Sequence, residues 1–226
     1  MNLLAIDTAA KSCSVAIVGN HILLCEISTT SEETHSKRLM EMIHKSFSLS
    51  GLSVSDIDGF AVTRGPGSFT GLRIGISTLK GLAMASGMPV VGVSTLDALA
   101  SQSPPFNGLV CPMLDARKNE VYIARYRFAR NGLKKEIDEQ VLSPERALTG
   151  IEEPCYMIGE GAVRYREAIR DILGPLAIFA PPGQHAIRAS SVAFLSMEAF
   201  CSGRTETPEA LVPRYIRKAD AEKSRT

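Results

Sequence analysis

The sequence predicts an α/β protein built from two lobes that each begin with three strands. Short apolar runs open the chain, a Gly-Asn pair joins the second run to the third, and strand and helix patterns alternate afterwards. A length of 226 residues allows one large domain or two small ones. The three-strand opening differs from the strand–helix–strand start of a doubly wound nucleotide-binding sheet.

In the first half, the expected order is three strands, then a helix, a strand, a helix, a strand and a helix. Gly19-Asn20 predicts a tight turn that joins the second expected strand to the third. Gly51 and Gly87 stand where helices end, because glycine adopts the left-handed conformation that closes a helix. The expected strands are 3–6, 14–18, 21–27, 59–63 and 90–93, and the expected helices are 33–50, 68–86 and 95–100.

The second half resembles a smaller, degenerate copy of the first. Pro104 and Pro105 predict a linker, which gives an N-terminal lobe over 1–103 and a C-terminal lobe over 104–226 that ends in a short basic tail. The expected strands are 109–114, 121–128, 134–141, 155–158 and 177–179, and the expected helices are 144–149, 163–173 and 191–201.

Composition excludes several classes of protein. With 25 basic and 24 acidic residues, the net charge of +1 argues against a protein that binds nucleic acid without a partner. No apolar run approaches the roughly 18 residues of a membrane span, and the start lacks the basic segment of a secretory signal. Five scattered cysteines without a C-x-x-C pair favour a reducing compartment, so we expect a cytoplasmic protein.

Asp7 and Thr8 end the first expected strand. A carboxylate and a hydroxyl there suit a nucleotide phosphate or its magnesium, but they equally suit a turn whose N–H groups they satisfy. The next residues are Ala9, Ala10 and Lys11, not the glycines that let backbone approach phosphate. Both interpretations stay open.

The segment from Gly65 to Gly75, GPGSFTGLRIG, is the most distinctive of the chain. It is neither a Walker A loop nor a G-x-S-x-G nucleophile elbow, although a glycine turn at a helix start favours anions. Gly67, Gly71 and Gly75 recur every four residues, which exposes one helix face to a very close neighbour. This nearly uncharged helix is either central to its domain or part of a subunit interface, and the wide apolar arc of the preceding helix favours the interface.

Two charged segments lie in the second half. The run from Asp115 to Tyr122, DARKNEVY, is either an anion-binding turn or a solvated hairpin tip. The run from Pro213 to Lys218, PRYIRK, is either a contact to tRNA or a partner, or a solvated tail.

Together, Asp7-Thr8, the glycine-rich segment, DARKNEVY and Pro213-Arg214-Tyr215 resemble the bacterial TsaB (YeaZ) family, in order and over almost the whole chain. The resemblance implies the actin-like, Hsp70-like ATPase fold (ribonuclease H-like), with two βββαβαβα lobes of which the second is degenerate. That order agrees with the one expected from the residues.

The resemblance also implies a role in forming N6-threonylcarbamoyladenosine (t6A) beside the anticodon of tRNA. In that family, TsaB is the non-catalytic partner of the transferase paralogue TsaD, the ATPase TsaE joins them, and tRNA is reached only through the complex. The first two helices are expected to pair with TsaD or with a second copy of the chain, and the two pairings compete. No cofactor is implied beyond weak or vestigial nucleotide binding at Asp7 and Thr8. We expect the interface to include His35, Leu39, Met42, Phe69, Gly71, Leu72 and Gly75.

A bulky residue at Gly75 is accordingly expected to abolish pairing without unfolding the chain. The catalytic paralogue carries a metal-binding H-x-x-x-H pair, and Thr95 and Leu99 stand at those positions here. Leucine cannot ligate a metal and a neutral threonine is a poor ligand, which predicts a pseudo-enzyme with no catalytic or metal-binding residues. The alternative is an active nucleotide-dependent ATPase or kinase of the same superfamily. A peptidase lacks support because no nucleophile and base lie in a recognisable pattern.

Overall fold

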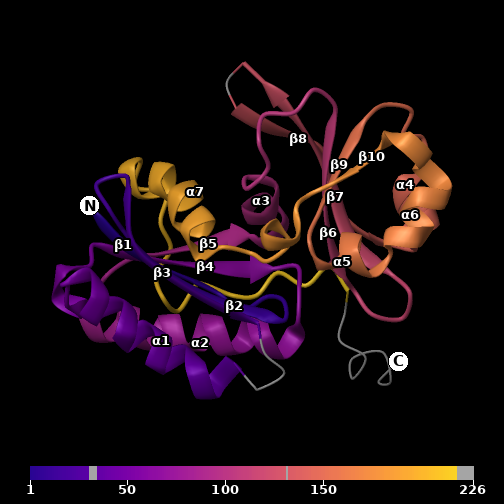
Figure 1. Cartoon of the computed structure of the whole chain (residues 1–226). Coiled ribbons are helices and arrows are strands. Elements are labelled where there is room, and N and C mark those ends of the chain that lie inside the picture. The colour runs from indigo at the N-terminus through magenta and orange to yellow at the C-terminus, as the bar shows by residue number, and fades with distance from the viewer. Residues whose placement is uncertain (31–34, 131, 218–226) are drawn as a thin grey trace. The chain divides into compact units, whose positions relative to one another are not determined.

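The computed structural model describes residues 1–30, 35–130 and 132–217, without the side chain of His35. These residues form two compact units (Figure 1). Unit 1 comprises Met1–Ala98 and Ile187–Arg214, and unit 2 comprises Leu99–Ala186 with the described residues from Tyr215. The α/β class and the three-strand start of both halves are confirmed.

Unit 1 is built on a five-stranded sheet of order β3-β2-β1-β4-β5. The first three strands of the chain pair antiparallel, whereas β4 and β5 extend the sheet in parallel with β1. Alternate apolar residues of the central strands therefore need cover on both faces. The strands are β1 (Asn2–Asp7), β2 (Ser12–Gly19), β3 (Ile22–Thr30), β4 (Gly59–Gly65) and β5 (Val90–Ser94).

Helices cover both faces of this sheet. Helices α1 (His35–Ser50) and α2 (Phe69–Ser86) lie on one face, where Leu39 and Leu79 join Leu4 in a single buried cluster. Helix α7 (Ala189–Cys201) lies on the other face, as Figure 1 shows, and the Ala189 N–H donates to Ser14 Oγ at 3.0 Å. The short helix η1 (Val54–Asp56) also belongs to this unit, and the boundary between the two units falls within the short helix α3 (Thr95–Ala100).

The bounds of α2 follow from its caps. The Ser68 side chain accepts a hydrogen bond from the Gly71 N–H at 3.2 Å, the expected role of serine before a first turn. At the other end, Gly87 adopts the left-handed conformation with φ of 72°. Both ends lie where the sequence predicts them.

Unit 2 repeats the strand pattern of unit 1. Its sheet has the order β10-β9-β6-β7-β8, again with three antiparallel strands followed by two parallel ones. The prediction of a degenerate copy is thus confirmed at the level of strand order. The elements are β6 (Leu109–Asp115), β7 (Val121–Ala129), β8 (Gly132–Leu142), α4 (Pro144–Leu148), β9 (Cys155–Ile158), α5 (Glu160–Arg164), α6 (Arg166–Leu173), η2 (Gly174–Leu176), β10 (Ala177–Phe179) and η3 (Pro182–Gln184).

Two features differ from the sequence prediction. The helix expected over 163–173 is two helices, which meet at Tyr165 with φ of −103° and ψ of 25°. In addition, residues 187–214 pack with unit 1 instead of belonging to a C-terminal lobe over 104–226, because α7 covers the second face of the first sheet. None of the helices that the structure describes is long and apolar enough to span a membrane.

Candidate functional site

Asp7 is buried at the carboxyl end of β1, where its carboxylate organises the following turn. Asp7 Oδ1 accepts hydrogen bonds from Thr63 Oγ1 at 2.7 Å and from the Ala9 N–H at 3.2 Å. Burial, together with the nearby charge of Asp7, raises the pKa of the Cys13 thiol to about 12. Cys13 therefore remains a thiol at physiological pH and is a poor nucleophile.

Thr8 fills the space left by two glycines of α2. Thr8 Oγ1 donates to the Gly71 carbonyl at 2.8 Å, and it lies where a Cβ at Gly75 would stand. A Cβ at Gly71 would overlap the Thr8 carbonyl oxygen. The close neighbour predicted for the glycine stripe is thus Thr8, which directly follows the chain's own first strand.

The N-terminus of α2 is closed by the turn that follows β1. The Ser68 N–H donates to the Ala9 carbonyl at 2.7 Å, and a Cβ at Gly67 would overlap that same oxygen. Three N–H groups near this helix start, those of Ala9, Ser68 and Gly71, are paired within the chain. Asp7 and Thr8 hold the turn against the helix.

Thr95 and Leu99, the two positions that the family resemblance compares with the transferase's metal pair, lie on α3. Thr95 and Leu99 stand four residues apart and are both fully buried. Neither side chain presents a nitrogen, sulfur or carboxylate ligand. Elsewhere in the described ranges, no three His, Cys, Asp or Glu side chains come together as a metal site would require.

Several residues predicted for the interface lie in the core instead. Leu39, Met42 and Leu72 are buried in unit 1, which corrects their assignment to a partner-facing surface. Gly71 and Gly75 are occupied by Thr8, as described above. The side chain of His35 lies outside the described part of the chain. The sequence did not separate core residues from surface residues here, because a wide apolar arc does not show which part of a helix faces the sheet.

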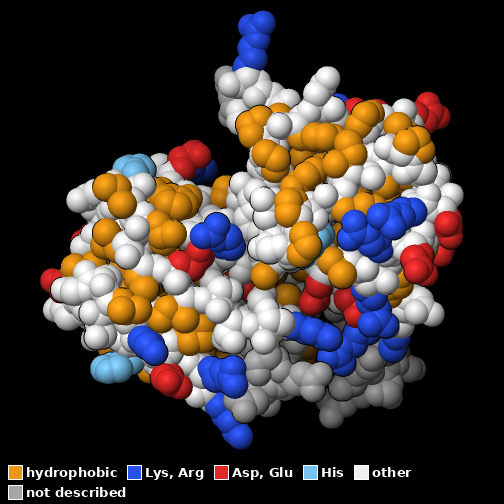
Figure 2. Space-filling model, viewed as in Figure 1, with side chains coloured by type: hydrophobic (Ala, Val, Ile, Leu, Met, Phe, Trp, Pro, Cys, Tyr) orange, Lys and Arg blue, Asp and Glu red, His pale blue; other side chains and the backbone are white. Residues whose placement is uncertain are grey.

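The open face of α1 and α2 carries exposed apolar residues, and of the expected interface residues Phe69 is among them. Met40 of α1 and Met84 of α2 are 53% and 61% exposed, and Leu49 and Phe69 are also exposed. The Phe69 ring lies 3.9 Å from the guanidinium carbon of Arg73. Figure 2 shows hydrophobic side chains mixed with charged ones over these helices. Sequence reasoning missed Met40 and Met84, although Met40 lies at the margin of the predicted arc.

Comparisons with known proteins agree with this architecture. The family model described as TsaD, tRNA N6-adenosine threonylcarbamoyltransferase, matches residues 24–224. The tRNA threonylcarbamoyladenosine biosynthesis protein TsaB of Bacillus subtilis is 32% identical over 226 residues, which cover 98% of this chain and 96% of that protein. TsaB of Escherichia coli is 42% identical over 153 residues, 64% of each chain.

Comparison with solved structures also indicates this family and shows the fold. YeaZ from Pseudomonas aeruginosa superposes with a TM-score of 0.82 at 30% identity, covering 95% of this chain and 99% of that one. The activator of the 2-hydroxyisocaproyl-CoA dehydratase from Clostridium difficile has a TM-score of 0.55 at 12% identity and covers 90% and 97%, a likeness of fold alone. The expected actin-like ATPase fold is therefore confirmed. Full-length similarity of sequence and structure shows that the chain belongs to the TsaB (YeaZ) family.

Proposed function

We propose that this chain is a non-catalytic scaffold subunit required for threonylcarbamoyl transfer to tRNA. The observation that carries the proposal is the burial of Thr95 and Leu99 at the positions of the transferase's metal pair, within a chain related to TsaB along its whole length. A subunit that keeps the fold of the transferase family but lacks metal ligands at those positions can position a catalytic paralogue without catalysing the transfer itself.

The surface proposed for pairing is the open face of α1 and α2. Exposed apolar residues lie on both of these adjacent helices, Met40 and Leu49 on opposite sides of α1 and Phe69 and Met84 on α2, and adjacent helices with exposed apolar residues can form a helical bundle with another protein. We assign this face to the transferase paralogue TsaD and to a second copy of the chain. The two partners compete for it because their surfaces overlap.

The remaining parts of the proposal follow from the family. The ATPase TsaE joins once TsaD is bound, and tRNA binds to the assembled complex instead of to this chain alone. The chain supplies no cofactor of its own, because the donors around Asp7 and Ala9 are paired internally. Free cysteines, all five unpaired by disulfides, accord with the cytoplasm as its place of action.

Reconstitution tests the proposal directly. TsaD, TsaE and the enzyme that makes threonylcarbamoyl-adenylate are incubated with unmodified tRNA, with and without this chain, and t6A is measured by mass spectrometry of nucleosides. We expect t6A only when the chain is present. Equal t6A formation in its absence overturns the proposal.

The alternative is a nucleotide-dependent enzyme, an ATPase or a kinase of the same fold. The buried Asp7 at the end of β1 favours it, since a carboxylate at that place suits a magnesium nucleotide. The internal pairing of Asp7 Oδ1 argues against it. Steady ATP turnover by the isolated chain that is lost in Asp7→Asn would support this alternative.

A further inference from the structure

Two cysteines of unit 2 lie side by side in its buried core. Cys111 is on β6 and Cys155 is on β9, and their Sγ atoms are 2.9 Å apart. A third sulfur atom, Met157 Sδ, lies 3.3 Å from Cys155 Sγ. Both thiols are free and fully buried, and the function proposed above makes no use of them. The sequence did not pair them, because 44 positions separate the two residues.

The register of the sheet brings the two thiols together. Strands β6 and β9 are parallel neighbours in which Cys111 is the partner of Met157, so Cys155 lies two positions away along β9. Side chains two positions apart on a strand point to the same face, which makes the two cysteines diagonal neighbours on one face of the sheet. Helix α6 covers that face, since both thiols belong to the same buried cluster as Ile169.

The two sulfur atoms are close enough to form a covalent bond after a small movement. A disulfide has an S–S length of about 2.05 Å, so the sulfur atoms need to approach by roughly 0.9 Å. Diagonal neighbours on adjacent strands are farther apart at the backbone than directly opposite residues are. A bond between them therefore carries strain, and strained disulfides are reduced more readily than relaxed ones.

In the closed fold, both thiols are protected from oxidants. The hydrogen bond with Cys155, and then burial, raise the pKa of the Cys111 thiol well above its ordinary value, so this thiol stays protonated. The thiolate is the form that attacks an oxidant, and neither cysteine is exposed to solvent. Oxidation therefore requires local opening of the sheet.

Strand β9 lies close to one edge of the sheet. In the described part of the chain, β10 is the one strand between β9 and that edge, and it has three residues, whereas β6 is the central strand. Segments that few backbone hydrogen bonds hold at an edge open more often than a central strand does. Separation of β9 from β6 would expose both sulfur atoms at once.

We propose that Cys111 and Cys155 are a redox pair, which a hydroperoxide oxidises to a disulfide and which thiol reductants reopen. In the open sheet, the thiolate of one cysteine attacks the peroxide, the O–O bond breaks, and the products are a sulfenic acid and water or an alcohol. The second thiol then attacks that sulfur, the S–S bond forms, and the sulfenic oxygen leaves as water. The two thiols thus lose two electrons and two protons, and the same two electrons reduce the peroxide.

The redox pair is compatible with a reducing compartment. Cellular thiols keep such a pair reduced at rest, so the disulfide forms when peroxide accumulates. Once formed, the bond ties β9 to β6, and that edge of the unit 2 sheet can no longer separate.

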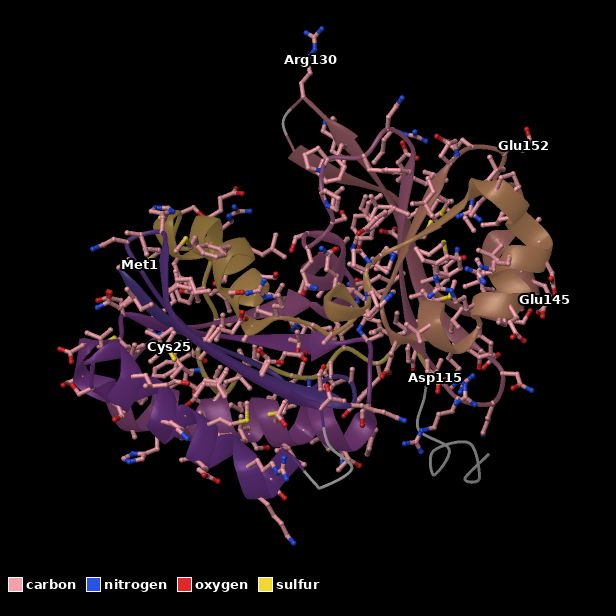
Figure 3. All side chains as sticks on the ribbon, viewed as in Figure 1. Met1, Cys25, Asp115, Arg130, Glu145 and Glu152 are labelled. Atoms are coloured by element: carbon pink, nitrogen blue, oxygen red, sulfur yellow. The ribbon has the colours of Figure 1, made fainter. Side chains whose placement is uncertain are left out.

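The test uses the full chain in the background Cys25→Ser with Cys201→Ser, which removes the two cysteines that reach solvent. Figure 3 labels Cys25, which belongs to unit 1. The protein is treated with hydrogen peroxide, the remaining thiols are blocked under denaturing conditions, and the peptides are identified by mass spectrometry. We expect a loss of two thiols and of two hydrogen atoms in mass, with a peptide that joins Cys111 to Cys155. Dithiothreitol should restore both thiols.

Urea below the unfolding midpoint distinguishes oxidation through opening from direct attack on the closed fold. Because the sheet has to open, formation of the bond should accelerate by at least about 10-fold between buffer and urea just below the midpoint. In buffer, the oxidised protein should exchange the amide hydrogens of β9 more slowly than the reduced protein does.

Three single variants in the same background serve as controls. Cys111→Ala and Cys155→Ala each remove one member of the redox pair, so neither variant can form the bond. The matched control is Cys13→Ala, which removes a buried thiol of unit 1 and should leave the rate of bond formation unchanged. Circular dichroism checks that each variant is folded, and the background chain itself gives the full result if one is not.

Two results overturn the proposal. One is that Cys111 and Cys155 both remain thiols after peroxide treatment at every urea concentration below the midpoint. The other is that oxidation yields sulfinic acid, or a bond to Cys13 or to another chain, instead of the internal bond. Neither result depends on t6A formation, so a failure of the proposed function is seen separately.

Discussion

Gly75 is one of two glycines at which α2 lies directly against Thr8, the residue that follows β1. A Cβ there would overlap Thr8 Oγ1 and also approach Val62 Cγ2 at 3.5 Å. Gly75→Ala therefore forces β1 and α2 apart, and we expect it to lower the free energy of unfolding by about 1–3 kcal/mol. Urea denaturation followed by circular dichroism measures this change. On the same ground, we expect a larger residue at Gly75 to affect folding as well as pairing.

Gly81 provides the matched control for that substitution. It lies on the same helix, and among the described residues an added Cβ meets no atom within 4 Å. Gly81→Ala should stabilise the protein by about 0.5–1 kcal/mol, because alanine restricts the unfolded chain and favours helix. Equal effects of the two substitutions would contradict the close packing of Thr8 against Gly75.

His185 carries a second prediction, because the fold keeps its imidazole neutral. The Gly159 N–H donates to Nδ1 at 3.1 Å, so the proton resides on Nε2, which lies 2.9 Å from the Ala180 carbonyl. Burial lowers the pKa of His185 below its ordinary value of 6.5, and Arg166 adds to this effect. Below pH 6.5 the unfolded chain binds more protons than the folded one, so stability is lost as the pH falls toward the lowered pKa.

Urea denaturation at pH 7.5, 6.5 and 5.5 tests the role of His185. The wild-type free energy of unfolding should fall more steeply with acidification than that of His185→Gln, which has no imidazole to protonate. The variant should be less stable at pH 7.5 because it loses the fixed pair of hydrogen bonds. Parallel pH dependences in the two proteins would rule out His185 as a source of acid sensitivity.

The contact partners of single residues could not be predicted from the sequence. Asp7 and Thr8 were identified from the end of a strand, but spacing did not show that Thr63 and Gly71 are their partners. These contacts join residues more than fifty positions apart, and they depend on the register of β1 against β4.

At the scale of elements, local signals predicted α2 better than they predicted its neighbours. Ser68 and Gly87 fixed its two ends, because capping depends on residues adjacent in sequence. The same reasoning did not separate α5 from α6, since the break at Tyr165 carries no glycine or proline. It also did not show which part of the α1 arc faces the sheet.

The pair of helices α1 and α2 yields a third prediction. Met84 is largely exposed on the open face, so Met84→Asp should leave the free energy of unfolding within about 0.5 kcal/mol of wild type. In a paired bundle, the carboxylate that Met84→Asp introduces would be buried without a positively charged neighbour, which is strongly unfavourable. We expect loss of TsaD binding and of self-association, measured by gel filtration with light scattering.

Leu195 supplies the control for that substitution. It is an exposed apolar residue of α7, on the opposite face of the same sheet. Leu195→Asp should retain both pairings. If Met84→Asp pairs as the wild type does, or if Leu195→Asp fails equally, the open face of α1 and α2 is not the specific interface.

At the scale of the whole molecule, strand order was predictable but the path of the chain was not. Alternating patterns gave three strands followed by crossovers in both halves, and each sheet has that order. The return of residues 187–214 to unit 1 follows from packing between segments that lie far apart in sequence. Pro181 and Pro182 lie just before the return at Ile187, but a proline pair does not show which unit the following segment joins.

This return has a consequence for fragments of the protein. Without α7, the unit 1 sheet would expose the alternate residues of β1 and β2 that face it, including Leu3 and Ala5, and Glu26 would lose its partners. Glu26 accepts from the Ser190 N–H at 2.9 Å and pairs with Arg188. A fragment of residues 1–103, the lobe expected from the sequence, should therefore be unfolded or insoluble.

A fragment that joins 1–98 to 187–214 through a glycine-serine linker of about 20 residues should instead fold, because it restores the helix on the open face of the sheet. Cooperative urea unfolding and dispersed amide signals in an NMR spectrum are the expected results. Glu26→Ala in the joined fragment should weaken it, since the N-terminus of α7 loses its acceptor. Cooperative folding of 1–103 by itself would show that α7 is dispensable to the first unit.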